Sequence, residues 1–162
     1  MSSNQIEPAT RISRSASILL NASIDLVFPL FTPLGEKKWV PGWNPCIIYP
    51  EPHQLEEGLI FQTPGRFPGE SFYTWVLQTY DVQIHLAKYT VFTSDRIWFI
   101  TVQCREQALT KTEATITYTF TSLTDLGKSL NEKALDMMFE ENLLDWEKAL
   151  NHFLETGQLI TF

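Results

Sequence analysis

The chain has 162 residues, of which 44% are hydrophobic and 13% aromatic, and its formal net charge is −7 at pH 7. This length suits one domain, and the acidic balance excludes nucleic acid and anionic membrane surfaces as expected partners, because both attract basic proteins. Cys46 and Cys104 have no CxxC spacing, so we expect free thiols in a reducing compartment. No apolar run approaches the roughly 18 residues of a membrane span, and no signal segment is apparent. These features predict a cytoplasmic protein without membrane insertion.

The start of the chain divides into a polar stretch and a first strand. Residues 1–10 are polar, and we expect them to be frayed, with a single domain in residues 11–162. Residues 11–21 end in a short apolar run and predict a strand. The chain contains no internal repeat or low-complexity segment that would indicate a second domain.

Two short helices are predicted after this strand. Residues 24–31 present an apolar face, with Ser23 as a suitable N-cap. Pro29 lies inside this segment and removes a helical hydrogen bond, so the helix must be short or kinked. Thr32 and Pro33 then begin a second helical turn, because proline is well tolerated at the first helical position.

The central part of the chain is rich in β-branched and aromatic residues, which favour strands. Strands are predicted at residues 47–49, 59–63, 71–80, 83–92, 96–105 and 111–122. The links between the last four are short, so we expect antiparallel hairpins. In the last strand, threonines alternate with residues such as Ile116 and Tyr118, which marks one wet and one covered face. The pattern does not decide which faces of residues 83–92 and 96–105 point inward.

The C-terminal residues 129–155 carry the clearest helical pattern. Their apolar residues recur at steps of three and four, the spacing of one helix face: Leu135, Met138, Phe139, Leu143, Trp146, Ala149, Leu150 and Phe153. Ser129 and Glu132 fit a capping box at the start, and Gly157 follows as the expected C-cap. We predict one long, continuous helix that lies across a wide, curved antiparallel sheet, with a pocket between them.

Residues 27–43, VFPLFTPLGEKKWVPGW, resemble the SRPBCC proteins, the START-like or Bet v 1-like superfamily. The chain looks most similar to their small bacterial members, the polyketide-cyclase and Hsp90-ATPase-activator homologues. Residues 122–127 and 146–153 also look similar, and the likeness extends over residues 11–155. The resemblance implies an α+β helix-grip fold. In it, a curved antiparallel sheet of about seven strands has two short helices after the first strand and a long C-terminal helix packed across it.

This fold hosts several unrelated functions, so the resemblance leaves three classes open. The leading expectation is a carrier or sensor that binds a small hydrophobic or aromatic ligand, lipid- or polyketide-like, between sheet and helix. The alternatives are a cyclase- or dehydratase-type enzyme that uses a cavity acid or base, and a protein-interaction domain of the co-chaperone kind. Whether any reaction is catalysed stays open. The expected partner is a small apolar molecule, and the chain is expected to be a monomer or homodimer.

Aromatic side chains are the candidate walls of the pocket, although each alone is an ordinary core residue. The candidate ligand-binding residues are Trp39, Trp43, Tyr73, Trp75, Tyr89, Tyr118, Met138, Phe139, Asn142 and Trp146. Asn142 falls on the apolar side of the predicted helix, three residues beyond Phe139, where an amide needs a partner. That partner is either a group of a strand or the ligand, and we favour the strand.

Strong catalytic motifs are missing from the sequence. It has no GxSxG, HExxH, P-loop or Rossmann pattern, and its histidines lack the spacing of metal ligands. We therefore expect neither a metal nor a cofactor. His85 is the one weak catalytic candidate, as a cavity acid or base. Glu36 and Glu70 could act as bases and Arg66 could meet an anion at the pocket mouth, but solvent exposure is the default for charged residues.

Overall fold

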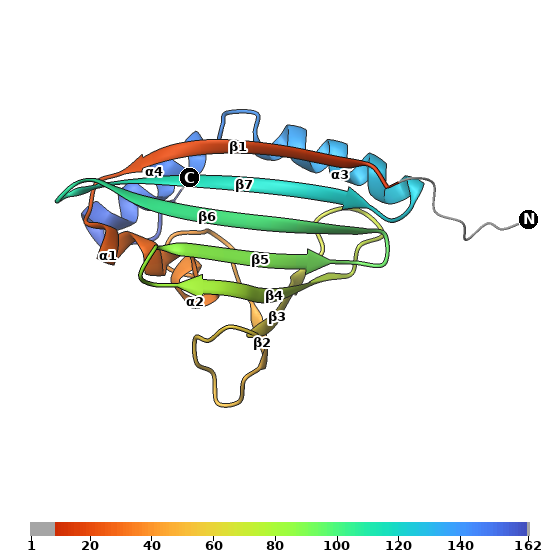
Figure 1. Cartoon of the computed structure of the whole chain (residues 1–162), viewed down its shortest axis with the longest axis horizontal. Coiled ribbons are helices and arrows are strands. Elements are labelled where there is room, and N and C mark those ends of the chain that lie inside the picture. The colour runs from red at the N-terminus through yellow and green to blue at the C-terminus, as the bar shows by residue number, and fades with distance from the viewer. Residues whose placement is uncertain (1–8, 162) are drawn as a thin grey trace, which may run out of the picture.

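The computed structural model of the protein describes residues 9–161. Seven antiparallel strands form one curved sheet in the order β1-β7-β6-β5-β4-β3-β2 (Figure 1). The strands are β1 Arg11–Leu20, β2 Cys46–Tyr49, β3 Ile60–Pro64, β4 Phe72–Asp81, β5 Leu86–Phe92, β6 Arg96–Ala108 and β7 Lys111–Ser122. Every predicted strand is present, with its ends within three residues of those expected. The predicted frayed segment lies almost wholly in residues 1–8, outside the described residues.

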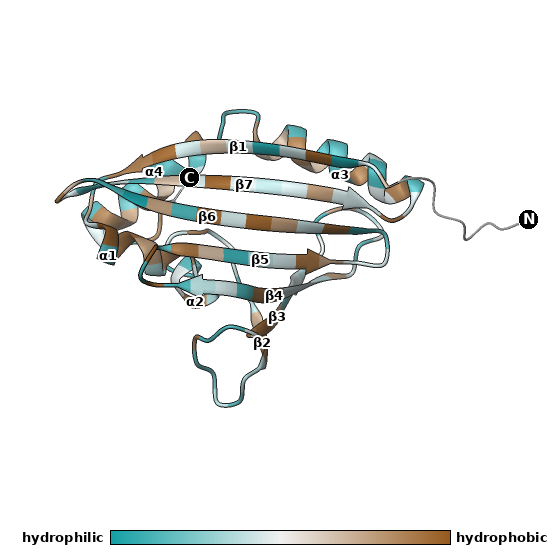
Figure 2. Ribbon diagram, viewed as in Figure 1, coloured by the Kyte–Doolittle hydropathy of each residue, from teal (hydrophilic) through white to brown (hydrophobic). Residues whose placement is uncertain are grey.

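The alternation along the strands defines the inner face of the sheet. In β7, Tyr118 and Phe120 are buried while the threonines between them are more exposed, as predicted. The structure also decides the phase of the two strands that the sequence left open. Tyr89 of β5 and Trp98 and Ile100 of β6 point to the buried side. Hydrophobic and polar residues accordingly alternate along the strands (Figure 2).

Three short helical turns follow β1: α1 Ile24–Val27, the 3-10 turn η1 Phe28–Phe31 and α2 Pro33–Glu36. Pro29 explains the interruption, because it lies at the start of η1, where its missing N–H breaks no helical hydrogen bond. Ser23 is the N-cap of α1 by backbone geometry, but its side chain makes no capping hydrogen bond.

Close contacts fix α2 against the body of the protein. The Thr32 hydroxyl accepts a hydrogen bond from the backbone N–H of Gly35 at 3.0 Å. A Cβ atom at Gly35 would lie 2.2 Å from the Pro29 carbonyl oxygen, so only glycine permits this approach. The indole N–H groups of Trp39 and Trp43 donate to carbonyl oxygens of the helical turns, each at 2.8 Å. These contacts fix the position of Glu36, the last residue of α2.

The C-terminal helix is broken in two, so the prediction of one continuous helix over residues 129–155 is wrong in that respect. The first part is α3 Asp125–Met138 and the second is α4 Leu144–Thr156. α3 packs over β7 and touches β1 and β6, whereas α4 packs against β1 (Figure 1). The predicted fold class is nevertheless confirmed, because helices on one face of a curved antiparallel sheet form the α+β helix-grip architecture.

The ends of this helical region differ in how well the sequence predicted them. Gly157 has φ of +71° and is the C-cap of α4, as expected. The N-cap of α3 is Thr124, whose side chain accepts a hydrogen bond from the backbone N–H of Gly127 at 3.1 Å. Ser129 therefore lies inside the helix and does not cap it, which corrects the predicted capping box.

The break between the helices has a local cause. Asn142 and Leu143 have φ values of +52° and +63°, in the left-handed region that asparagine adopts more readily than most residues. For Leu143 this conformation costs about 1–2 kcal/mol. The cost is offset because Leu143 and Phe139 are both completely buried, at 0% exposure. The turn thus directs both side chains into the core. None of the helices within residues 9–161 is both long and apolar enough to cross a membrane.

Candidate ligand-binding site

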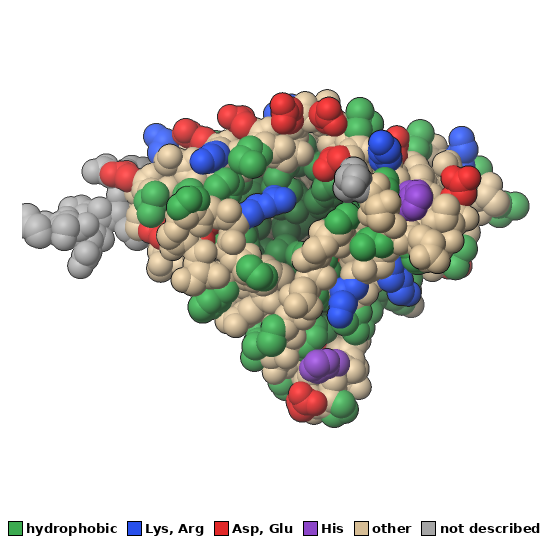
Figure 3. All heavy atoms as spheres, turned by 180° about the vertical axis from the view of Figure 1, so that it is seen from behind, with side chains coloured by type: hydrophobic (Ala, Val, Ile, Leu, Met, Phe, Trp, Pro, Cys, Tyr) green, Lys and Arg blue, Asp and Glu red, His purple; other side chains and the backbone are tan. Residues whose placement is uncertain are grey.

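The inner face of the sheet is hollowed at its centre. The space-filling view from the side opposite to Figure 1 shows a depression whose floor consists of hydrophobic side chains (Figure 3). Acidic side chains follow the rim above it, and a basic side chain stands at its edge. We call this depression the hollow.

Aromatic residues at the β3–β5 side of the sheet form one connected group. Phe61 and Trp75 stack with ring centroids 5.1 Å apart, and Trp43 and Tyr89 meet Trp75 edge-on at 5.5 and 5.9 Å. The Tyr89 hydroxyl donates a hydrogen bond to the carbonyl oxygen of Phe31 at 2.7 Å. We call Trp43, Phe61, Trp75 and Tyr89 the first aromatic row. Three of its four members are predicted ligand-binding residues.

A second aromatic row joins the helices to β7. Trp146 of α4 lies edge-on to Trp39 at 5.7 Å and to Tyr118 at 6.4 Å, and Phe139 meets Tyr118 at 6.0 Å. All four of these residues are predicted ligand-binding residues. The helix break contributes to the row, because Phe139 caps α3 while Trp146 lies in the first turn of α4.

Glu36 is the last residue of α2, and its charge acts on Tyr89 of the first row and on Tyr118 of the second. Its side chain is half-buried, and no hydrogen bond or ion pair joins its carboxyl to another residue within the described part of the chain. Burial raises the pKa of Glu36 from 4.5 to about 8. Burial, and to a smaller extent the Glu36 carboxyl, also raises the pKa of Tyr89 and of Tyr118. The carboxyl is therefore partly removed from water, has a pKa raised by burial, and has no partner in the described residues.

The Tyr118 hydroxyl is a second polar group without a partner. Tyr118 is only 6% exposed, and its hydroxyl makes no hydrogen bond to the residues that the structure describes. The Tyr118 hydroxyl is also not completely buried. In residues 9–161, Nδ2 of Asn131 is the one side-chain polar atom that is both fully buried and without a hydrogen bond, so the unpaired Tyr118 oxygen must retain some exposure. The hydroxyl therefore borders open space. Arg66, exposed on the loop after β3, lowers the pKa of Tyr118 and opposes the larger effects of burial and Glu36.

A buried polar cluster occupies the α3 end of the sheet. Arg96 and Glu70 are 1% and 5% exposed and form a bidentate ion pair, with Nη2–Oε1 at 2.9 Å and Nε–Oε2 at 3.0 Å. The Tyr73 hydroxyl donates to Glu70 and accepts from Arg96, and Asn131 Oδ1 accepts from Arg96 at 3.4 Å. Burial, together with the hydrogen bond to Glu70, raises the pKa of Tyr73 to about 12. We call Arg96, Glu70, Tyr73 and Asn131 the polar cluster.

The sequence reasoning missed this cluster although one signal was present. Arg96 is in phase with Trp98 and Ile100, so a charged residue stands on the buried face of β6. A buried arginine requires a partner, and Glu70 provides it across the β3–β4 loop. Tyr73 was predicted to bind ligand, but its hydroxyl is engaged in the cluster.

His85, the weak catalytic candidate, lies outside both aromatic rows. It falls in the turn before β5 with φ of +57°, so it is not part of the strand as predicted. Its ring meets Phe28 edge-on at 5.5 Å, and its Nε2 atom is 3.7 Å from Oδ1 of Asp25. These contacts place it against α1 and η1.

Asn142 does not lie on the covered face of a helix, which corrects its predicted position. It is exposed in the turn between α3 and α4, and its Oδ1 atom accepts a hydrogen bond from Arg14 at 3.4 Å. The prediction failed because it assumed that the helix continues through residue 142. Met138, the other non-aromatic candidate, is half-buried and packs against the core at the end of α3.

Other sites for ions or ligands are small in the described residues. No group of three or more His, Cys, Asp or Glu side chains within residues 9–161 is arranged to hold a metal ion. A separate recess of about 140 Å³ lies between α2 and the loop that joins β2 to β3, lined by residues that include Pro33, Ile47 and Leu55. Small-molecule sites usually measure about 300–1,000 Å³, so this recess is a minor feature.

Comparison with known proteins identifies the fold but gives no close relative. No protein-family model and no curated protein matches the sequence. Among solved structures, truncated norcoclaurine synthase from Thalictrum flavum aligns with a TM-score of 0.68 and 14% identity, over 94% of this chain and 98% of that one. The Zhui aromatase/cyclase from a Streptomyces species aligns with a TM-score of 0.65 and 14% identity, over 90% and 94% of the two chains. Ara h 8.0201 aligns with a TM-score of 0.61 and 12% identity, over 91% and 99%.

These alignments cover nearly the full length of both partners, so they describe the whole architecture. They confirm the predicted helix-grip fold, which this chain shares with these three structures. At such low sequence identity the likeness concerns the fold, and function has to be argued from the hollow and its side chains.

Proposed function

We propose that this protein binds a small apolar or aromatic molecule in the hollow, as a carrier or sensor. Two observations carry the proposal: the pair of aromatic rows, with rings from β3, β4, β5, β7 and α4, and the depression with a hydrophobic floor in the space-filling view. Burial of apolar ligand surface, at about 25 cal/mol per Å², would supply the driving force. One or two polar groups would then set the orientation of the ligand.

The proposed walls are the members of the two rows together with Met138. From the first row these are Trp43, Trp75 and Tyr89, and from the second Trp39, Tyr118, Phe139 and Trp146. Tyr73 and Asn142 are left out of the proposed contacts, because the Tyr73 hydroxyl is held in the polar cluster and Asn142 is exposed in the turn between α3 and α4.

The solved structures of similar fold give this proposal indirect support. One structure of norcoclaurine synthase holds dopamine and hydroxybenzaldehyde, which are small aromatic molecules. Another neighbour is an aromatase/cyclase. Both of these neighbours are enzymes, so we also consider an enzymatic function for this chain.

That second candidate is an acid–base enzyme of cyclase or dehydratase type, and Glu36 is the observation that favours it. Burial raises the pKa of Glu36 to about 8, within the range in which a carboxyl can donate and accept protons near neutral pH. The unpaired hydroxyl of Tyr118 could hydrogen-bond a carbonyl oxygen of a substrate. In this alternative, Glu36 takes the role that the sequence pattern suggested for His85.

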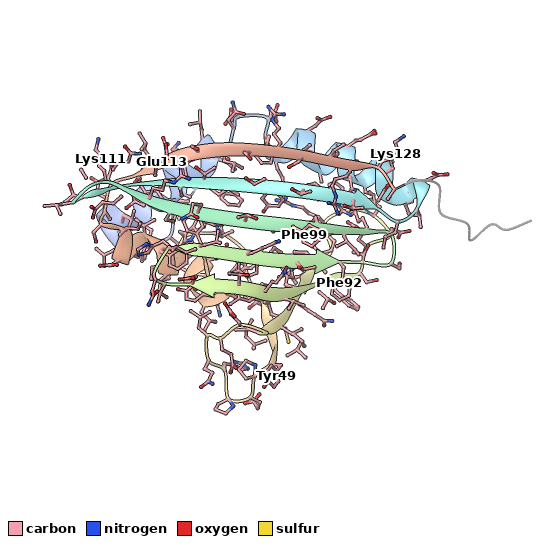
Figure 4. All side chains as sticks on the ribbon, viewed as in Figure 1. Tyr49, Phe92, Phe99, Lys111, Glu113 and Lys128 are labelled. Carbon is pink, nitrogen blue, oxygen red and sulfur yellow. The ribbon has the colours of Figure 1, made fainter. Side chains whose placement is uncertain are left out.

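A binding titration with a neutral apolar fluorophore, N-phenyl-1-naphthylamine, tests the main proposal. We expect saturable binding by the native protein, at least about five-fold weaker in Trp146→Leu, which removes a ring from the second row. The control is Phe99→Leu. Phe99 lies on the outer face of the sheet, which faces the viewer in Figure 4, beneath the charged groups of Arg11 and Lys88.

The outcomes are separable. No saturable binding by the native protein, together with no co-purified small molecule in native mass spectrometry, would overturn the proposal. Equal affinity of Trp146→Leu, Phe99→Leu and the native protein would place the binding site outside the hollow. If Trp146→Leu does not fold, Trp146→Phe retains a ring of smaller area and gives the same comparison with a smaller effect.

A further inference from the structure

The end of the sheet that carries α1 exposes apolar side chains from three different elements. These elements are α1, the turn between β4 and β5, and the tip of the β6–β7 hairpin (Figure 1). Leu109 at the hairpin tip is 82% exposed, Leu26 of α1 is 64% exposed and Val82 of the turn is 61% exposed. These are the three highest values for large hydrophobic side chains in residues 9–161. Ile84 of the same turn is exposed as well. We call these four residues the apolar end.

Polar contacts hold the three elements side by side. In the β4–β5 turn, the Nε2 atom of His85 is 3.7 Å from Oδ1 of Asp25 in α1. The Nε2 group of Gln103 in β6 donates a hydrogen bond to the carbonyl oxygen of Ile84 at 2.7 Å. At the start of β7, the Thr112 hydroxyl donates to a backbone carbonyl oxygen of the β1–α1 link at 2.8 Å. The apolar side chains therefore project from one connected end of the molecule.

Local structure does not account for apolar side chains at these positions. Leu109 is one of the two residues that join β6 to β7, a place that favours glycine, asparagine or aspartate. Val82 and Ile84 are β-branched residues in a turn, where small polar residues predominate. The Asp81 carboxylate fixes this turn, because it accepts hydrogen bonds from the N–H groups of Gln83 and Ile84 at 2.9 and 3.2 Å. Single exposed apolar residues are normal, but four at one end indicate a contact surface.

The charges around the apolar end determine which partner suits it. The same elements carry more acidic than basic neighbours: Asp25, Asp81, Glu106 and Glu113 against Arg105 and Lys111. Lys111 and Glu113 mark this end in Figure 4. A symmetric dimer through this end would bring two acidic sets together, and an anionic lipid surface would repel them. A zwitterionic lipid surface has no net charge, and it adapts to separate apolar tips without the shape complementarity that a protein interface needs.

We propose that the apolar end docks on zwitterionic lipid surfaces, with its four side chains inserted shallowly at the boundary between headgroups and acyl chains. Burial of their apolar groups drives the docking, while the acidic neighbours stay in water. The inference goes beyond the proposed function and does not depend on it, because none of the four residues belongs to an aromatic row.

Co-sedimentation with vesicles of pure palmitoyl-oleoyl-phosphatidylcholine tests the proposal. The native protein is compared with Leu26→Ser/Leu109→Ser and, as the control, with Leu126→Ser/Met137→Ser. The two control residues lie on α3 and are 55% and 56% exposed, close to the value for Leu26. We expect the control to bind within about two-fold of the native protein and the apolar-end variant to bind at least about ten-fold more weakly. Replacement of about a third of the lipid by phosphatidylserine should weaken binding of the native protein.

The outcomes separate the possible occupants. Absence of binding to the vesicles by the native protein would overturn the proposal, and so would equal binding by both double variants or tighter binding to the vesicles that contain phosphatidylserine. Self-association of the lipid-free native protein in sedimentation equilibrium, lost in Leu26→Ser/Leu109→Ser, would identify a second copy as the occupant and would also overturn it.

Two further measurements keep the test interpretable. Circular dichroism checks that each variant is folded, and Leu109→Ser alone provides a second comparison with an expected loss of about three-fold. The N-phenyl-1-naphthylamine titration, performed without vesicles, should give the same affinity for all variants, because the apolar end lies outside the aromatic rows. Failure of lipid docking would therefore leave the proposed ligand binding standing.

Discussion

Two carboxyl groups, Glu36 and Glu70, lie inside this protein in opposite circumstances. Glu70 is 5% exposed and has a bidentate arginine partner and a tyrosine hydroxyl. Glu36 is half-buried beside two aromatic rows and has no partner in the described residues. Burial raises the pKa of Glu36, a shift that arises where no cation offsets the loss of water.

The difference separates a carboxyl that is held within the fold from one that is left without a partner in the described residues. In the polar cluster nearly every donor and acceptor is used within the chain, and the cluster ties the β3–β4 loop to β6 and α3. The Glu36 carboxyl, by contrast, makes no hydrogen bond or ion pair within residues 9–161, and neither does the Tyr118 hydroxyl. Unsatisfied polar groups in a folded protein call for an explanation, and the proposed binding of a small molecule would supply one.

The largest expected effect comes from breaking the polar cluster. Arg96→Met leaves the Glu70 carboxylate buried without its cation, which we expect to lower the free energy of unfolding by about 3–5 kcal/mol. Urea denaturation measures the loss, and Arg105→Met, at an exposed position of the same strand, is the control. The double variant Arg96→Met with Glu70→Leu should recover part of the stability. A loss below about 1 kcal/mol in the single variant would mean that Glu70 reaches water without Arg96.

A smaller effect is expected from Glu36, with a characteristic pH dependence. Its pKa is raised from 4.5 to about 8, so between these values the folded protein holds a proton that the unfolded chain releases. Stability from this group is therefore present at low pH and is lost as the pH rises through about 8. Glu36→Gln should have the same stability as the native protein at pH 5. At pH 9 it should be more stable by about 2–3 kcal/mol, less than the full shift implies because the group is half-exposed.

Urea titrations at pH 5, 7 and 9 measure this difference. Glu140→Gln is the matched control, since the carboxylate of Glu140, exposed just beyond α3, should produce no such trend. A stability difference between Glu36→Gln and the native protein that stays constant across the three pH values would show that Glu36 is solvated like an ordinary surface residue. The contrast between the two carboxyls would then disappear.

The contrast also explains which parts of the molecule were predictable from sequence. Alternation in β7 and the apolar spacing around Phe139 and Trp146 report burial directly, so the strands, the helical segments and most buried aromatic residues followed from pattern. The helix break did not follow, because Asn142 and Leu143 fit a helical spacing while their backbone is left-handed.

Charged side chains were the least predictable residues. Both Glu36 and Glu70 were assigned to solvent by default, and their burial depends on tertiary neighbours that no local pattern reveals. The burial of Arg96 could have been predicted from its place in the alternation along β6. For Glu36, the sequence offered only its position directly after Gly35, which is tightly packed. The burial of the aromatic residues could thus be predicted, but the burial of the Glu36 and Glu70 carboxyls could not.

The smallest effect compares two tyrosines that border Glu36. The Tyr89 hydroxyl donates to the Phe31 carbonyl at 2.7 Å, so Tyr89→Phe leaves a buried acceptor unpaired and should cost about 1–2 kcal/mol. The Tyr118 hydroxyl has no partner in residues 9–161, so Tyr118→Phe should change stability by less than about 0.5 kcal/mol. Urea denaturation of the ligand-free variants distinguishes the two. If Tyr118→Phe were as costly as Tyr89→Phe, the Tyr118 hydroxyl would have to stabilise the fold and would not be free to bind a ligand.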